Sequence, residues 1–83
     1  MDKKYTKEQI YNKLCEIISE EFEVNKSLLR PEANLFIDLD LDSIDAVDLA
    51  VRIQQYIDKR ISPEEFKQIK TLNDAVEAVY DLL

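Results

Sequence analysis

The sequence predicts an all-α fold, a small four-helix bundle with a long loop between the first and second helices and a short third helix. Apolar residues recur three and four positions apart along most of the chain, and no stretch alternates for long between apolar and polar residues. Cap-forming residues stand before the apolar runs. The 83 residues, of which 46% are hydrophobic, suffice for one domain over 1–83 with one modest core.

The first helix is expected from about Lys7 to Phe22, because Thr6 and Gln9 have the spacing of a capping box. The helical periodicity then fails from Glu23 to Asp42, which predicts the long loop. We expect the apolar residues of this loop to pack on the core; they are Val24, Leu28, Leu29, Leu35, Phe36 and Leu39.

The second helix is expected to begin at Asp42 or Ser43 and to run to about Asp58. Ser62 is the expected cap of a short third helix that ends near Ile69, since a proline and two glutamates follow it. Residues 71–74 offer another cap. The final helix then carries the apolar residues Ala75, Val76, Val79, Tyr80, Leu82 and Leu83.

The composition excludes several classes of function. The net charge of −7 repels phosphate backbones and anionic lipid headgroups, so we expect basic protein partners and neither nucleic acid nor membrane. One cysteine cannot form an intramolecular disulfide, and neither a signal peptide nor a long apolar window is apparent. These features predict a cytoplasmic monomer.

The reactive groups that most enzymes need are also missing. Without His, the chain cannot form a His/Cys zinc site or an imidazole-based triad, and without Gly it lacks phosphate-binding glycine loops. Cys15 lies at the edge of the apolar face of the first helix, which indicates a packed side chain. We therefore expect no metal site, and any reactive group to come from outside the chain.

The negative charge is concentrated around the second helix. Residues 38–58 hold 6 acids and 1 base, whereas residues 1–37 hold 7 acids and 6 bases. The same helix is apolar on two opposite faces. One face is the expected core face, Ala46, Leu49, Ala50, Ile53 and Ile57, and the other is Ile44, Val47 and Val51, bordered by Asp45, Asp48 and Arg52. An aliphatic stripe beside acids is typical of a protein docking site. Two alternatives remain: the charge run is an ordinary solvated face, or the third helix or the long loop covers Ile44 and Val51.

Ser43 stands at the head of this helix and has two interpretations. It is a favoured N-cap residue, and so is Asp42, which has Asp45 three positions on in box-like spacing. A hydroxyl at this place is also where an attached phosphate would be stabilised by free N–H groups and the helix dipole.

The same segment partly matches a calcium-binding loop. Asp38, Asp40 and Asp42 alternate as the first EF-hand ligands do, but the positions that require Gly and a bidentate Glu are Ser43 and Leu49. An unmodified acidic module that binds a protein or a divalent metal remains the alternative function.

The segment from Leu39 to Leu49 resembles an acyl carrier protein. In that family a D-S-L or D-S-I motif opens the second helix, and Asp42-Ser43-Ile44 fits it. The similarity also covers residues 36–38, the apolar spacing at Leu49, Ile53 and Ile57, and the turns before the last two helices. Asp40 departs from the family, which commonly has Gly there, but Asp tolerates a left-handed backbone.

The resemblance implies that Ser43 carries phosphopantetheine through a phosphodiester, and that acyl groups are bound as thioesters to the thiol at the end of this group. It also implies that the protein itself catalyses nothing. The acyl chain is expected to slip between the helices. The implied partners are a phosphopantetheinyl transferase and acyl-loading, ketosynthase, reductase, dehydratase and acyltransferase enzymes of fatty-acid, polyketide or aryl-polyene synthesis. The implied partner-binding residues are Asp38, Asp42, Asp45 and Asp48, with Ile44, Val47 and Val51 as apolar contacts.

Overall fold

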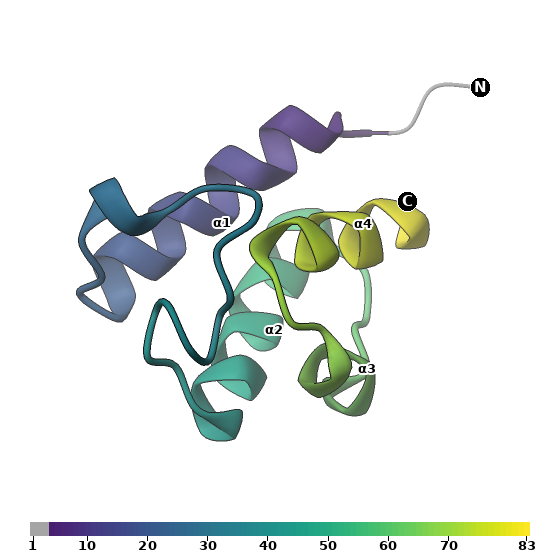
Figure 1. Cartoon of the computed structure of the whole chain (residues 1–83). Helices are drawn as coiled ribbons and strands as arrows, with labels where there is room; N and C mark the ends of the chain where they lie inside the picture. Colours follow the sequence, from purple (N-terminus) through teal and green to yellow (C-terminus); the bar gives the residue numbers. More distant parts are fainter. Residues whose placement is uncertain (1–3) are drawn as a thin grey trace.

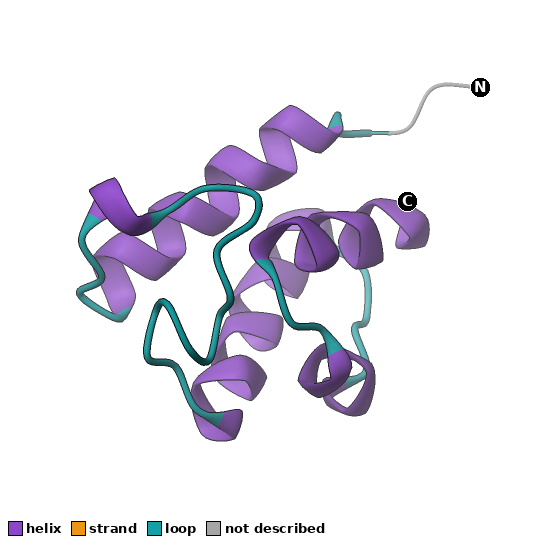
Figure 2. Ribbon diagram, in the orientation of Figure 1, coloured by secondary structure: helices purple, strands orange, loops and turns teal. Residues whose placement is uncertain are grey.

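The computed structural model describes residues 4–83, and in this range the predicted all-α fold is confirmed. Four α-helices and one short 3₁₀-helix follow each other along the chain (Figures 1 and 2). Their bounds are α1, Lys7–Glu21; η1, Lys26–Leu28; α2, Ser43–Ile57; α3, Pro63–Gln68; and α4, Leu72–Leu82. One isolated bridge, between Asn34 and Thr71, ties the long connection to the start of α4.

Capping boxes begin three of the four α-helices. Thr6 with Gln9 begins α1, Asp42 with Asp45 begins α2, and Thr71 with Asp74 begins α4. In each box the cap side chain accepts from the backbone N–H three residues on, so a donor that the helix cannot use internally is satisfied. The capping box expected at Thr6 and the cap expected within residues 71–74 are thus confirmed.

The third helix starts differently. Ser62 occupies the N-cap position of α3, but its side chain makes no capping hydrogen bond. The predicted position of Ser62 at the cap is confirmed, although its side chain contributes no hydrogen bond there. The acids Glu64 and Glu65 in the first turn still oppose the positive end of the helix dipole.

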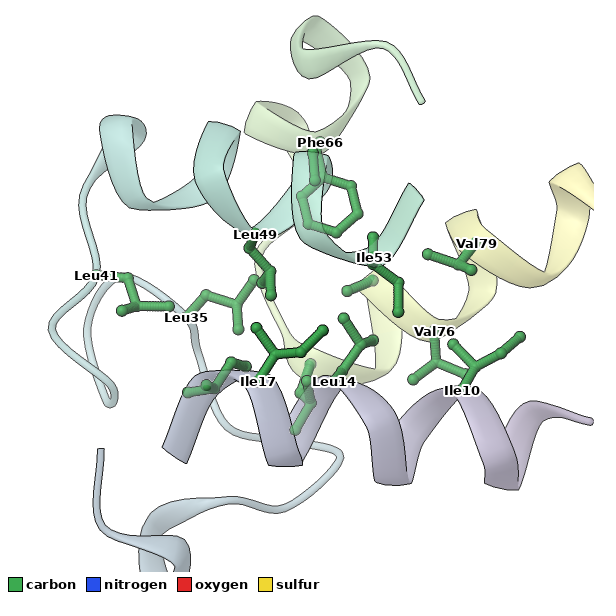
Figure 3. Close-up of a cluster of buried hydrophobic side chains, with 14 of the residues drawn as sticks. Ile10, Leu14, Ile17, Leu35, Leu41, Leu49, Ile53, Phe66, Val76 and Val79 are labelled. Atoms are coloured by element: carbon green, nitrogen blue, oxygen red, sulfur yellow. The ribbon is translucent and has the colours of Figure 1, made fainter. Parts of the chain in front are cut away.

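The core lies where α1, α2 and α4 face one another, and α3 closes it against α2 (Figure 3). Phe66 of α3, 1% exposed, is the largest fully buried side chain. The core face predicted for the second helix is confirmed, because each of its five residues is buried. The main contributors are Ile10, Leu14, Ile17, Ile18, Leu49, Ile53, Ile57, Phe66, Leu72, Val76 and Val79.

The long connection between α1 and α2 packs on the core for most of its length. Leu35 and Leu39 are buried, and Val24, Leu29 and Phe36 pack against the core while remaining partly exposed. Leu28 is 46% exposed, so the expectation that it packs on the core is wrong. It lies in η1, whose start is fixed by the Asn25 side chain accepting from the backbone N–H of Ser27 at 2.9 Å.

Candidate functional site

Ser43 is the first residue of α2, and the residue before it does the capping. The Asp42 Oδ1 accepts from the backbone N–H of Asp45 at 2.9 Å, and the Asp45 Oδ2 accepts from that of Asp42 at 3.2 Å. The Ser43 side chain is exposed, and no other group in residues 4–83 forms a hydrogen bond with its hydroxyl. Of the two caps that the sequence allowed, the structure thus selects Asp42 and leaves the Ser43 hydroxyl uncommitted.

A turn formed by residues 34–41 leads into this helix, and we call it the pinned turn because side-chain and backbone hydrogen bonds fix its path. The Asn34 Oδ1 accepts from the backbone N–H groups of Phe36 and Ile37, both at 2.9 Å. The Asp38 Oδ2 accepts from the backbone N–H of Asn34 at 2.8 Å, and the Leu41 N–H donates to the Leu35 carbonyl at 3.0 Å. These bonds satisfy backbone groups that no helix or strand pairs, and they give the approach to Ser43 one defined path.

The outward side of α2 carries the second apolar stripe. Ile44 is 76% exposed and Val51 is 39% exposed, while Val47 between them is half-buried. The sequence prediction of a helix that is apolar on two faces is confirmed, since the opposite face is fully buried. Asp45 and Asp48 are half-buried on the same helix, and Asp38 and Asp42 are exposed on the segment before it.

Arg52 is the one basic residue of α2, and it forms ion pairs with two acids. Its Nε lies 3.3 Å from the Asp48 Oδ1, one turn earlier, and its Nη1 lies 3.3 Å from the Glu21 Oε2 at the end of α1. The sequence indicated the first neighbour by its spacing of four residues but gave no signal for the second, which depends on how α1 packs on α2. One arginine therefore offsets part of the charge of Asp48 and Glu21, whereas Asp38, Asp40, Asp42 and Asp45 form no ion pair among the described residues.

A hollow of about 380 Å³ separates the turn from the end of α1. Apolar side chains, among them Phe22, Val24 and Leu41, line it together with the carboxylates of Asp38, Asp40 and Asp45. No lysine or arginine of residues 4–83 lines it. The hollow thus leaves the turn uncovered on the side of α1 and adds to the negative surface beside Ser43.

The structure does not assemble the acids into a metal centre. Among residues 4–83, no three His, Cys, Asp or Glu side chains come close enough together to hold an ion. Cys15 is half-buried beside Tyr11, and burial raises the pKa of its thiol, which makes the thiolate scarce. The described part of the chain also contains no helix with the length and apolar character needed to cross a bilayer.

Comparison with known proteins identifies the family. The profile described as the phosphopantetheine attachment site matches residues 12–79. Acyl carrier protein 2 of Ralstonia nicotianae is 46% identical over 78 residues, covering 94% of this chain and 96% of that protein. The chain belongs to the acyl carrier protein family.

Other acyl carrier proteins are similar over nearly the same range. That of Lactobacillus acidophilus is 35% identical over 74 residues, or 89% of this chain and 92% of that protein. That of Coprothermobacter proteolyticus is 36% identical over 73 residues, or 88% of this chain and 89% of that protein. Phosphopantetheine is accordingly the covalent prosthetic group of this acyl carrier protein.

Proposed function

We propose that Ser43 carries the phosphopantetheine arm and that the protein presents acyl intermediates as thioesters on the thiol at the end of that arm. One observation supports Ser43 in particular. Its hydroxyl is exposed and uncommitted because Asp42 caps α2 in its place. Ser62 also stands at a helix start, but Asp42-Ser43-Ile44 is the segment that matches the family motif.

The attachment forms one bond and breaks another. The Ser43 Oγ attacks the phosphorus of coenzyme A that bears the pantetheine, and the pyrophosphate P–O bond breaks. The adenosine bisphosphate leaves with the electron pair, and the serine proton passes to a base or water of the transferase. The product phosphodiester lies at the N-terminus of α2, where unpaired backbone N–H groups and the helix dipole favour negative charge.

The surface around Ser43 would then dock the partner enzymes. Ile44, Val47 and Val51 supply apolar contact area, and Asp38, Asp42, Asp45 and Asp48 supply the charge that steers a basic partner. Acyl carrier proteins interact in general with a phosphopantetheinyl transferase and with biosynthetic enzymes. For this chain we propose acyl-loading, ketosynthase, reductase, dehydratase and acyltransferase enzymes of fatty-acid, polyketide or aryl-polyene synthesis.

Under this proposal the protein is a cytoplasmic carrier of one domain, residues 1–83, and not a catalyst. The arm supplies the reactive thiol, and the partner enzymes supply the catalytic groups, including the imidazole side chains that the chain lacks. The acyl chain would insert into the aliphatic core between the helices, next to residues such as Leu49, Ile53 and Phe66.

Mass spectrometry after incubation with coenzyme A and a broad-specificity transferase tests the attachment. We expect one phosphopantetheine on the wild type, none on Ser43→Ala, and one on Ser62→Ala, which removes a second exposed serine at a helix start. An equal mass gain on Ser43→Ala would disprove the assignment. An unmodified wild type that instead binds calcium tightly and stoichiometrically would favour the acidic binding module.

A further inference from the structure

The most exposed large apolar side chain of the described residues is not on α2. Ile37 is 80% exposed and lies at the tip of the pinned turn, six residues before Ser43. Its neighbours on both sides along the chain point inward, since Leu35 is 1% exposed and Leu39 is 4% exposed. The exposed isoleucine offers apolar area that a partner protein can bury at a gain in binding free energy.

The exposure of Ile37 is not a result of a loose loop. The backbone N–H of Ile37 itself donates to the Asn34 Oδ1, and the N–H groups of Asp38 and Leu39 donate to the Asn34 carbonyl at 2.9 and 3.1 Å. The turn is further tied to the α3–α4 connection, because the Leu35 N–H donates to the Lys70 carbonyl at 2.8 Å. A side chain held outward in this way loses little conformational freedom when a partner covers it.

The charges around Ile37 indicate the chemistry of that partner. Every charged residue from 36 to 51 is an aspartate, and the first base after them, Arg52, is engaged with Asp48 and Glu21. Asp38 follows Ile37 directly, and Ile44 follows Ser43 directly. The complementary surface is thus an apolar recess bordered by lysine or arginine side chains.

We propose that Ile37 is a second apolar anchor, separate from the α2 stripe, for the enzyme that modifies Ser43. This inference rests on the proposed attachment at Ser43. The transferase must bring its own reacting groups to the Ser43 hydroxyl, so it must cover the chain on both sides of that residue. Enzymes that act on the thiol reach it through the arm and need not approach so closely. Ile37 in the pinned turn, before Ser43, and Ile44, after it, then both contact the transferase.

Steady-state kinetics of phosphopantetheine transfer from coenzyme A, with a broad-specificity transferase as the probe, test the proposal on the full chain. For Ile37→Gln we expect KM for the carrier to rise roughly 5- to 10-fold, because an aliphatic contact is lost, with kcat unchanged. Ile37→Leu should keep KM within about 2-fold, since it restores the buried area. The thermal midpoint should not change, because Ile37 is exposed in the free protein.

Leu28→Gln is the matched control. Leu28 is the other exposed large apolar residue of the same connection, at 46%, but it lies on η1 and not on the turn. Its KM should equal that of the wild type. A wild-type KM for Ile37→Gln, or an equal rise for Leu28→Gln, would overturn the anchor while leaving Ser43 as the attachment site. A wild-type chain that takes no phosphopantetheine would overturn both proposals.

Discussion

Asp40 shows how a single residue shapes the backbone of the turn that leads to Ser43. Its φ of 57° places it in the left-handed region, as do Glu23 at 56° and Asp58 at 57°. Glycine is absent from the chain, so acidic residues take these positions. Asp is one of the few other residues that visit this region routinely. The expectation that Asp40 lets the turn survive without glycine is confirmed.

Substitutions at Asp40 should therefore separate backbone geometry from charge. Asp40→Val should lower the free energy of unfolding by roughly 1–2 kcal/mol, since a β-branched side chain clashes in the left-handed region. Asp40→Gly should leave it unchanged or raise it. Urea denaturation of the two variants and the wild type measures the effect. Equal stability of all three would show that the turn relaxes to a different backbone.

Tyr11 and Cys15 should make stability depend on pH in the alkaline range. Burial raises the pKa of Tyr11 from 10.0 to about 12, with a hydrogen bond to Cys15 as the next cause, and burial also raises the pKa of Cys15. The native state thus keeps protons that the unfolded chain releases. Stability should be complete below about pH 7.5, where both groups are protonated even when unfolded, and should fall as the pH rises through the unfolded pKa of the thiol and then that of the phenol towards 12.

Thermal melts between about pH 8 and pH 11 check this, with Tyr11→Phe as the comparison. That variant cannot ionise at residue 11, so its midpoint should fall less steeply above pH 10 than that of the wild type. Parallel curves for the two proteins would contradict the assignment to Tyr11.

Among the elements, the helices could be predicted from the sequence because their signals are local. The capping residues and the spacing of apolar side chains place α1, α2 and α4 to within one or two residues of the structure. The long connection could not be predicted in detail. Its burial pattern depends on hydrogen bonds to distant residues, such as the bond between Leu35 and Lys70. Two of its apolar side chains, Leu28 and Ile37, are exposed although apolar side chains usually lie in the interior.

The site divides in the same way. The resemblance to the family motif indicated Ser43 and the acids beside it as candidates, and periodicity predicted the two faces of α2. The freedom of the Ser43 hydroxyl did not follow, because Asp42 and Ser43 are both good caps and sequence does not rank them. The ion pair between Arg52 and Glu21 could not be predicted from the sequence either, because it requires the end of α1 to lie beside the middle of α2.

The two kinds of helix start lead to a prediction on stability. Thr71→Ala removes the acceptor of a capping bond of 3.1 Å to the Asp74 N–H and should cost about 1 kcal/mol. Ser62→Ala removes no such bond and should cost only a few tenths. Chemical denaturation of both variants makes the comparison. A larger loss for Ser62→Ala would mean that its hydroxyl does cap α3 in solution.

Over the whole molecule, unbalanced negative charge should govern the response to salt. The net charge is −7, and the ion pairs, such as Lys7 with Glu77 and Arg52 with Asp48, are largely exposed and contribute little. Raising the ionic strength to about 0.15 M screens charges more than about 8 Å apart. Repulsion among the aspartates near Ser43 should weaken more than the close pairs do.

The thermal midpoint should therefore rise from low to moderate salt, as differential scanning calorimetry would record. Asp40→Asn should reduce the rise, because it removes one of the repelling charges while keeping a residue that tolerates the left-handed backbone. A midpoint that falls with salt would show that attraction within the ion pairs outweighs the repulsion.

The bridge between Asn34 and Thr71 has a consequence for local opening. The Leu35 N–H and the Leu72 N–H both cross between the two connections, at 2.8 and 2.9 Å, so the turn before Ser43 shares its backbone bonds with the first turn of α4. Neither amide can exchange its hydrogen with water unless the two segments part. Long loops usually fray at little cost, but we expect this one to open only together with the start of the terminal helix. We accordingly expect proteases to cut the segment before Ser43 slowly for a loop of its length.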